Sequence, residues 1–269
     1  MPRSSVAYFS FGGVSTKSYQ ITVDSSDTLV KPTRDVERIT IPGMSGGLTV
    51  DNGRFNDVSV TYHCFIKRGV DANFNGFLAA LLSMSGEQKL KDDRMDLYYT
   101  GTYNGLTSPG CYRKAILDSS VKAEEVYAGY SGAFDITFTC KPQLFLNVGD
   151  LPIEVTQGTV KTVVNPTKFA SAPLLQLYGK GTGTTDATMA RFSIGAYTIG
   201  VNVNCPTSYC WVDCETEDAY YQAQNYNSYI KAISGSFPRC IVSDIGATAS
   251  ITSPNSGGRM LIYPRWWTV

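Results

Sequence analysis

Alternation of apolar and polar residues with a period of two is the feature that most constrains this sequence. In the segment 58–66 every second residue is apolar or aromatic, and the residues between them are mostly polar. Four further segments repeat the pattern, namely 134–141, 190–194, 197–203 and 260–267. Because successive side chains of a strand point to opposite faces, each segment predicts a β-strand. Turn motifs separate them, such as PGMSGG at 42–47, DNGR at 51–54 and GKGTG at 179–183. Many short strands with such turns predict a mainly β protein of the sandwich or barrel type.

One segment, 71–86, departs from this alternation. Its apolar residues recur at the i, i+3, i+4, i+7 and i+8 positions that form one face of an α-helix. These residues are Phe74, Phe77, Leu78, Leu81 and Leu82. Gly76 lies within the segment and costs about 1 kcal/mol relative to alanine, so we expect packing against a sheet to hold this helix.

The strand pattern weakens between residues 147 and 172, where threonine and proline are frequent. We interpret 147–172 as a linker and first strand region between two domains. Residues 1–146 then form an N-terminal β-rich domain with one α-helix. Residues 173–269 form an all-β domain, with a candidate short helix at 219–233.

The charge balance argues against two classes of partner. The chain has 269 residues, with 23 Lys and Arg against 23 Asp and Glu, so its net charge is zero. A basic excess is what binds nucleic acid or an anionic membrane surface, so we expect neither role. The longest apolar run, Phe77–Leu82, is too short for membrane insertion. The first residues lack the apolar core of a signal peptide, so we expect the protein in the cytoplasm or exported without such a signal.

Catalytic and metal-binding motifs are weak in this sequence. His63 is the single histidine, and its place within an alternating segment is typical of a structural residue. The seven cysteines are best interpreted as reduced, buried thiols. Cys205, Cys210 and Cys214 form a CxxxxCxxxC run, but no histidine lies nearby to complete a usual zinc set. We therefore predict no cofactor, no metal, no catalytic residue and no enzymatic activity.

Two segments are candidates for interaction surfaces. The first is the mixed-charge strand containing Arg34, Asp35, Glu37 and Arg38, followed by a loop containing Pro42, Gly43 and Gly46. Such a strand is usually solvated, but alternating charges on a sheet edge can also align one subunit with another.

The second candidate is a cluster of tyrosine and asparagine at Tyr220, Tyr221, Asn225 and Tyr226. These residue types suit sugar stacking and protein interfaces alike. A loop packed on its own sandwich is an equally good interpretation, since tyrosine is common there too.

Several segments taken together resemble the distal tail proteins, or Dit, of siphophages. In chain order they are FSFGGVST, ITIPGMSGGLTVDNGRFND, YHCFI, YSGAFDITFTCKPQLF, NPTKFASAPLLQLYGKGTG, WVDCETEDAY, GSFP and SPNSGGRMLIYPRWW. They cover nearly the whole chain in a specific order and spacing. One departure concerns Met44, which follows Pro42-Gly43 where members of the family often carry a basic residue.

The resemblance implies a fold and an assembly. The fold is a β-sandwich-like belt domain at 1–146, which closes into a hexameric ring, followed by a galectin-like β-sandwich at 173–269. The ring contacts would involve the 34–38 strand and the PGMSGG loop. The partners implied are further copies in one ring or two stacked rings, the major tail or tube protein, and a tail hub or tail-associated lysin. In many phages receptor-binding proteins also dock. The location implied is the tail tip of the virion, after assembly in the bacterial cytoplasm.

The alternative function is a carbohydrate-binding module that uses the surface tyrosine and asparagine of the second half. The sugar site of galectins relies on a histidine among other residues, and the second half of this chain has none. The galectin-like outline therefore does not bring the lectin site with it.

Overall fold

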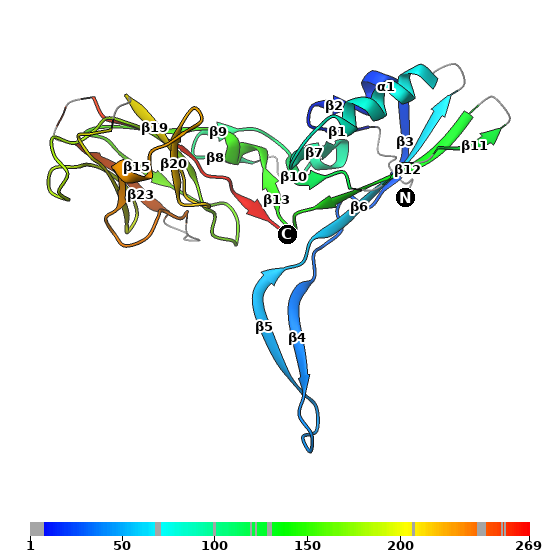
Figure 1. Cartoon of the computed structure of the whole chain (residues 1–269), viewed down its shortest axis with the longest axis horizontal. Coiled ribbons are helices and arrows are strands. Elements are labelled where there is room, and N and C mark those ends of the chain that lie inside the picture. The colour runs from blue at the N-terminus through cyan, green and yellow to red at the C-terminus, as the bar shows by residue number, and fades with distance from the viewer. Residues whose placement is uncertain are drawn as a thin grey trace. The chain divides into compact units, whose positions relative to one another are not determined.

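The structure is a computed structural model. It describes residues 8–67, 71–98, 101–118, 120–121, 123–127, 131–205, 208–240, 246–253, 255 and 257–269. The fold is mainly β, as the alternation predicts (Figure 1). The chain divides into two compact units, and we describe each by itself. Unit 1 takes the described residues of Met1–Tyr99, Gly110–Leu144 and Val269, and unit 2 takes those of Thr100–Pro109 and Phe145–Thr268.

Unit 1 is built around one antiparallel sheet. Its elements are β1 (Phe9–Phe11), β2 (Val14–Ser15), η1 (Thr16–Tyr19), β3 (Ile21–Ser26), β4 (Arg34–Thr40), β5 (Gly47–Phe55), β6 (Val58–Lys67), α1 (Asp71–Leu82), β7 (Gln88–Asp92), α2 (Asp93–Asp96), β10 (Cys111–Ile116), β11 (Ala123–Tyr127) and β12 (Ser131–Cys140). The sheet order is β2-β1-β7-β10-β12-β6-β3, and β11 pairs with β12. Strands β4 and β5 pair only with each other, as a long hairpin.

The central pair of this sheet is β6 and β12, whose register runs without interruption from Val58↔Cys140 to Lys67↔Ser131. The predicted alternation is confirmed here, because the apolar positions of both strands are at most 7% exposed. These positions are Val58, Val60, Tyr62, Cys64, Ile66, Phe134, Ile136, Phe138 and Cys140. Their aromatic rings pack tightly; the Phe9 ring stacks on Tyr62 at 4.2 Å and meets Phe138 at 5.6 Å between centroids.

Helix α1 is the predicted helix, and it packs against this core. Phe77 and Leu81 are 0% and 1% exposed, and the Phe77 ring lies 6.1 Å from the Phe9 ring. The buried face is narrower than the sequence pattern predicts, because Leu82 is 66% exposed. The apolar spacing in the sequence includes Leu82, which lies beyond the last residue of the helix that is buried in the core.

The short helix α2 was not predicted from the sequence. The Asp92 carboxylate accepts a hydrogen bond from the Met95 amide at 2.9 Å and so caps the helix. It also accepts from the Tyr62 hydroxyl at 3.1 Å and from Thr28, within the core. Burial raises the pKa of Asp92. Four residues are too few for a periodic signal, so sequence patterning could not find this helix.

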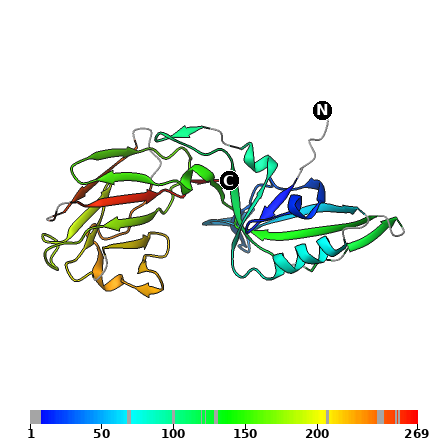
Figure 2. The same cartoon turned by 90° about the horizontal axis from the view of Figure 1, so that it is seen from above.

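Unit 2 contains two antiparallel sheets. Its elements are β8 (Thr102–Tyr103), β9 (Leu106–Thr107), β13 (Leu144–Leu146, beginning at the unit boundary), η2 (Asn147–Asp150), β14 (Ile153–Thr156), β15 (Val160–Val163), β16 (Leu174–Tyr178), β17 (Ala190–Ile194), β18 (Tyr197–Val201), β19 (Tyr209–Asp213), β20 (Asp218–Tyr221), β21 (Gln224–Asn225), η3 (Asn227–Tyr229), β22 (Ile230–Ala232), β23 (Ala247–Thr252), β24 (Arg259–Tyr263) and β25 (Trp267–Thr268). One sheet has the order β14-β24-β16-β19-β20-β21 and the other β15-β23-β17-β18-β22. Figure 2 shows the two sheets as layers.

The structure differs from the sequence interpretation in two places and makes a third more specific. Residues 147–172, interpreted as a linker and first strand region, lie in unit 2, where β14 pairs with β24 and β15 pairs with β23. Residues 219–233 form β20, β21, η3 and β22 instead of a helix. Residues 100–109 belong to unit 2, although they precede the last strands of unit 1.

Leu81 and Leu82 are adjacent in α1 but differ in exposure, at 1% and 66%, and so offer a sharp test of this packing. We expect Leu81→Asp to destabilise unit 1 by several kcal/mol, because it buries a charge without a partner. Leu82→Asp, a matched change one residue later on the exposed side, should leave the free energy of unfolding within about 0.5 kcal/mol of the native value. Urea unfolding of both variants measures this. Equal stabilities for the two variants would contradict the placement of α1.

Candidate functional site

The hairpin of β4 and β5 holds all the residues predicted as a ring interface. Figure 1 shows it extending away from the sheet of unit 1. Nearly every residue of the two strands is exposed. Its tip is a tight turn in which the Met44 amide donates to the Ile41 carbonyl at 3.2 Å. Pro42 and Gly43, with a φ of +82°, occupy the central positions as in a type II turn, which explains the PG pair.

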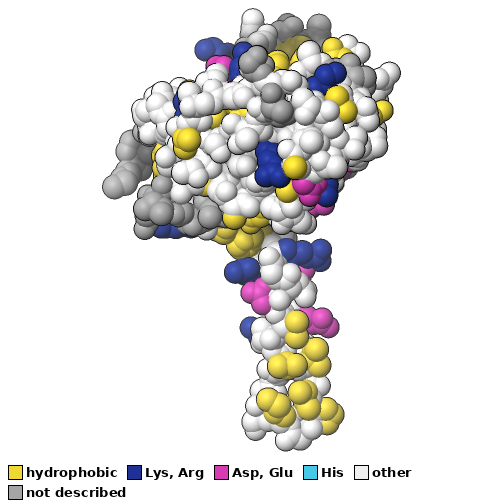
Figure 3. All heavy atoms as spheres, turned by 90° about the vertical axis from the view of Figure 1, so that its left-hand side faces the viewer, with side chains coloured by type: hydrophobic (Ala, Val, Ile, Leu, Met, Phe, Trp, Pro, Cys, Tyr) yellow, Lys and Arg dark blue, Asp and Glu magenta, His cyan; other side chains and the backbone are white. Residues whose placement is uncertain are grey.

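The hairpin has one apolar face. In the register Ile39 lies opposite Leu48 and Glu37 opposite Val50, so these side chains share a face. Ile39, Leu48 and Val50 are 41%, 47% and 37% exposed. At the tip, Ile41 and Met44 are also exposed, and Figure 3 shows hydrophobic side chains gathered along this outer part of the hairpin. We call Ile39, Ile41, Met44, Leu48 and Val50 the apolar hairpin patch. Sequence reasoning named the charges of this segment and missed the patch.

The charged residues of the hairpin divide into two groups. Arg34 lies 3.8 Å from Asp51 across the hairpin and stacks over the Phe55 ring at 4.9 Å. The Arg54 guanidinium donates to Asp35 and lowers the pKa of that carboxyl. In contrast, Glu37 and Arg38 form no ion pair with any described residue. The hairpin therefore uses one pair of its predicted charges internally and presents the other to solvent.

The DNGR motif, predicted as a turn, lies inside β5. The register shifts between Arg34 and Val36, which leaves extra residues on the β5 side. Gly53 takes a φ of +72°, and its amide donates to the Asp51 carboxylate at 2.8 Å. The motif therefore forms a β-bulge, a feature that uses the same residue types as a turn.

The tyrosine cluster of unit 2 is only partly a surface. Tyr220 lies opposite Asn225 at one edge of the sheet, and Tyr221 contacts the Tyr209 ring at 5.0 Å. Tyr226 is 6% exposed, and its ring packs between Tyr221 and Tyr229, so it does not belong to the predicted surface. The sequence pattern around these tyrosines does not indicate which of them is buried.

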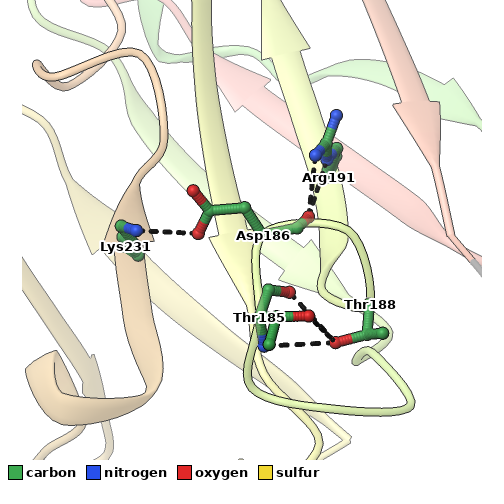
Figure 4. A network of polar contacts seen from close by, with 5 residues as sticks. All are labelled: Thr185, Asp186, Thr188, Arg191 and Lys231. Atoms are coloured by element: carbon green, nitrogen blue, oxygen red, sulfur yellow. Dashed lines mark hydrogen bonds and ion pairs between the residues drawn. The ribbon is translucent and has the colours of Figure 1, made fainter.

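The glycine-rich stretch at 179–183 leads into a loop fixed by its own contacts. Figure 4 shows Lys231 reaching the Asp186 carboxylate, at 2.7 Å, while Arg191 donates twice to the Asp186 carbonyl, at 3.0 and 2.8 Å. Thr185 and Thr188 bond to each other in the same loop. A cavity of about 400 Å³ lies beside it, lined by Ala187, Met189, Arg191, Thr252 and Ser253. Arg191 is the only charged residue among its described lining residues, and its Nε and Nη2 already donate to the Asp186 carbonyl.

The candidate catalytic and metal ligands lie apart. His63 pairs with Asp135 across β6 and β12, with 2.7 Å between Nδ1 and Oδ1, on an exposed face. No group of three or more His, Cys, Asp or Glu among the described residues could hold a metal ion. All seven cysteines are free and buried. The described chain also has no helix long and apolar enough to cross a membrane.

Burial also sets the chemistry of these thiols. It raises the pKa of Cys64, Cys111, Cys140 and Cys240 to about 12. It raises the pKa of Cys214 as well, and a hydrogen bond between the Cys210 and Cys205 side chains, followed by burial, raises that of Cys210. Because the thiolate is the nucleophile and the metal ligand, we expect these buried cysteines to react slowly in the folded protein.

Comparison with known proteins identifies the fold. No protein-family model matches the chain, and no curated protein matches it. Among solved structures, the chain is similar to the Dit (gp 19.1) protein of SPP1, described as a paradigm of the hub adsorption apparatus in phages infecting Gram-positive bacteria. The TM-score is 0.61 at 10% identity, over 97% of this chain and 99% of that one. It is also similar to a chain of the activated, calcium-containing baseplate of phage P2, with a TM-score of 0.50 and 10% identity over 90% of each chain. The chain therefore has the fold of a phage tail hub protein. In particular it has the Dit fold, which the sequence resemblance predicted.

We predict that the number of cysteines that react with a thiol reagent differs between the folded and the unfolded protein. In native buffer near pH 8, Ellman's reagent should react with well under one thiol per chain, since buried cysteines with raised pKa values hold few thiolates. In denaturant all seven thiols should react. Metal analysis of the same sample should find no stoichiometric zinc. A fast-reacting native thiol, or one zinc lost on Cys210→Ser, would contradict the assignment of these cysteines to the core.

Proposed function

We propose that this chain is a structural component of the tail tip of a long-tailed phage. The observation that carries the proposal is the likeness to the SPP1 hub protein over 97% of this chain and 99% of that one. The match therefore extends over both units of this chain. The role is one of assembly and not of catalysis. In it, six copies close into a ring that joins the tail tube to the tail hub or tail-associated lysin.

The apolar hairpin patch supports an assembly role by its energetics. A two-stranded hairpin with no sheet beside it is marginally stable in water. The five side chains of the patch remain between 37% and 54% exposed in the subunit. Covering the rest would add about half of the 1.5–3 kcal/mol that complete burial of such a side chain contributes. A neighbouring subunit that covers the patch would stabilise both the hairpin and the ring.

The two unpaired charges of the hairpin support a specific register. Glu37 lies on the same face as the apolar hairpin patch, while Arg38 lies on the opposite face. A ring repeats one head-to-tail contact, so each subunit needs two different complementary surfaces. Charges of opposite sign on opposite faces of one hairpin meet that requirement. We propose Glu37 and Arg38 as the residues that align neighbours, with Arg34 and Asp35 holding the hairpin itself together.

Unit 2 completes the proposed role. We assign it the outer, galectin-like position, from which it meets receptor-binding proteins and other tail components. Strand β15 and the loops of the sandwich are exposed and separate from the hairpin in sequence. The location that follows is the virion tail tip, after assembly in the bacterial cytoplasm.

Removal of the apolar hairpin patch should abolish the ring and spare the subunit. The native protein is expected to elute as six, or twelve, times its 29.3 kDa mass in light scattering on a sizing column. Ile39→Ser combined with Leu48→Ser should shift it to a folded monomer with an unchanged circular dichroism spectrum, because both side chains are largely exposed in the subunit. Its melting temperature should fall only by the amount that ring formation contributed. Val160→Ser, at a 67% exposed position of unit 2, is the matched control and should keep the ring. A native monomer at high concentration would overturn the ring.

Charge reversal at Arg38 should weaken ring formation in low salt but not in high salt. With Arg38→Glu we expect ring formation to need several-fold more protein in low salt, since an exposed ion pair contributes up to about 1 kcal/mol. Near 1 M salt, where screening acts within about 3 Å, the variant and native protein should converge. Lys161→Glu on β15 provides the control for net charge. A defect that persists in high salt would show that Arg38 acts by packing and not by charge.

A further inference from the structure

The outer face of one sheet in unit 2 carries a row of half-buried aromatic and amide side chains. The inner face of this sheet is an ordinary core, since Leu175, Leu177 and Val212 are 0% exposed. The outward positions of an antiparallel sheet are normally polar. Here the register places Leu261, Gln176, Trp211, Tyr220 and Asn225 in line across β24, β16, β19, β20 and β21.

A second row runs beside the first. Arg259, Tyr178 and Tyr209 are neighbours in the same register, with the Tyr178 and Tyr209 ring centroids 5.1 Å apart. The Arg259 guanidinium lies over the Tyr178 ring at 4.1 Å. On the other side, Tyr263 contacts Trp211 at 5.6 Å. Rings from neighbouring strands thus form one platform on the outside of the sheet, which we call the aromatic platform.

Gln176 lies at the centre of this platform and is the second, independent feature. The residue is only 8% exposed, no described residue forms a hydrogen bond with its side-chain amide, and the amide is not among the buried polar atoms left without a partner. Polar groups at this depth are normally satisfied by protein, water or ligand, so the Gln176 amide is available to a ligand that reaches the platform. Both register neighbours, Trp211 and Leu261, point the same way, so the amide opens onto the platform.

We propose that this aromatic platform binds a neutral, β-linked polysaccharide chain. Pyranose rings have flat C–H faces that stack on tyrosine and tryptophan, and hydroxyl edges that bond to amides such as Gln176 and Asn225. The row from β24 to β20 spans three strand spacings, about 14 Å in all, which is long enough for several sugar rings. β-Linkages keep successive rings extended and flat, as the line of side chains requires.

The chemistry favours a glycan over a protein at this site. A stable protein interface buries roughly 800 Å² on each partner, with an apolar core. The platform instead consists of two rows of half-buried rings with an amide between them. Its charges are largely engaged locally, as in the two hydrogen bonds of 2.8 and 2.9 Å between Arg265 and Asp213 at one end. An uncharged, hydroxyl-rich ligand fits this surface.

Calorimetric titration of the full-length protein tests the proposal. The probes are cellohexaose, laminarihexaose and chitohexaose, which are β-linked, and maltohexaose, which is α-linked. We expect saturable binding of at least one β-linked probe and weaker binding of maltohexaose. Trp211→Ala should weaken binding about tenfold or more, and Gln176→Leu several-fold, as the loss of one hydrogen bond implies. Trp267→Phe is the matched control, because Trp267 stacks on Phe169 and is not one of the platform residues, and it should bind as the native protein does.

The outcomes separate the possible occupants of the platform. Melting temperatures establish that each variant folds, and Tyr220→Ala replaces Trp211→Ala if the latter does not. Absence of binding to every probe, or binding that Trp211→Ala leaves unchanged, would overturn the proposal. A change of oligomeric state in folded Trp211→Ala would assign the platform to a protein contact and equally overturn it. Because the hairpin variants alone test the ring, failure of glycan binding is distinguishable from failure of the proposed assembly role.

Discussion

The pairing of β6 with β12 is the interaction on which unit 1 depends. The ladder is continuous over the whole length of both strands, and one of its faces is entirely buried. The hairpin leads directly into the start of β6, and α1 follows its end. A slip of one residue in this register would turn every apolar side chain of β6 to solvent. The same slip would move the base of the hairpin and the strand face that α1 packs on, so the core of the subunit also fixes where the hairpin begins.

Apolar residues alternate with polar ones both in the core strand β6 and in the hairpin, but only those of β6 are buried within unit 1. In β6 the alternating apolar residues are covered by α1 and neighbouring strands of the same chain. In β4 and β5 the alternating residues Ile39, Leu48 and Val50 stay between 37% and 47% exposed. Exposed apolar surface of this kind often marks interaction sites in soluble proteins. Most of it lies on one face, and Val36, which is 44% exposed, lies on the other.

Sequence reasoning predicted what periodicity determines and missed what it does not. The strands around Val60 and Phe138 and the helix around Phe77 were correct because their period matches the face they bury. The apolar hairpin patch was missed because alternation identifies two faces without saying which, if either, the subunit itself covers. The individual strands within 147–172 were not located because each is four residues long and pairs with a strand far away in the sequence. The strands within 219–233 were predicted as a helix because tyrosine and asparagine there carry no clear period of two.

Strands without a polar face therefore carry information of their own. An antiparallel strand with one solvated face needs only every second residue to be apolar. Strand β16 buries Leu175 and Leu177 inward, and its outward residues Leu174, Gln176 and Tyr178 are at most half-exposed. Strand β19 repeats this with Trp211 and Tyr209 outward. The interior of the sandwich accounts for one of the two faces. The other face leaves aromatic rings partly exposed to water. This exposure is the reason for proposing a binding surface on unit 2, as the exposed apolar residues of the hairpin are the reason for proposing one on unit 1.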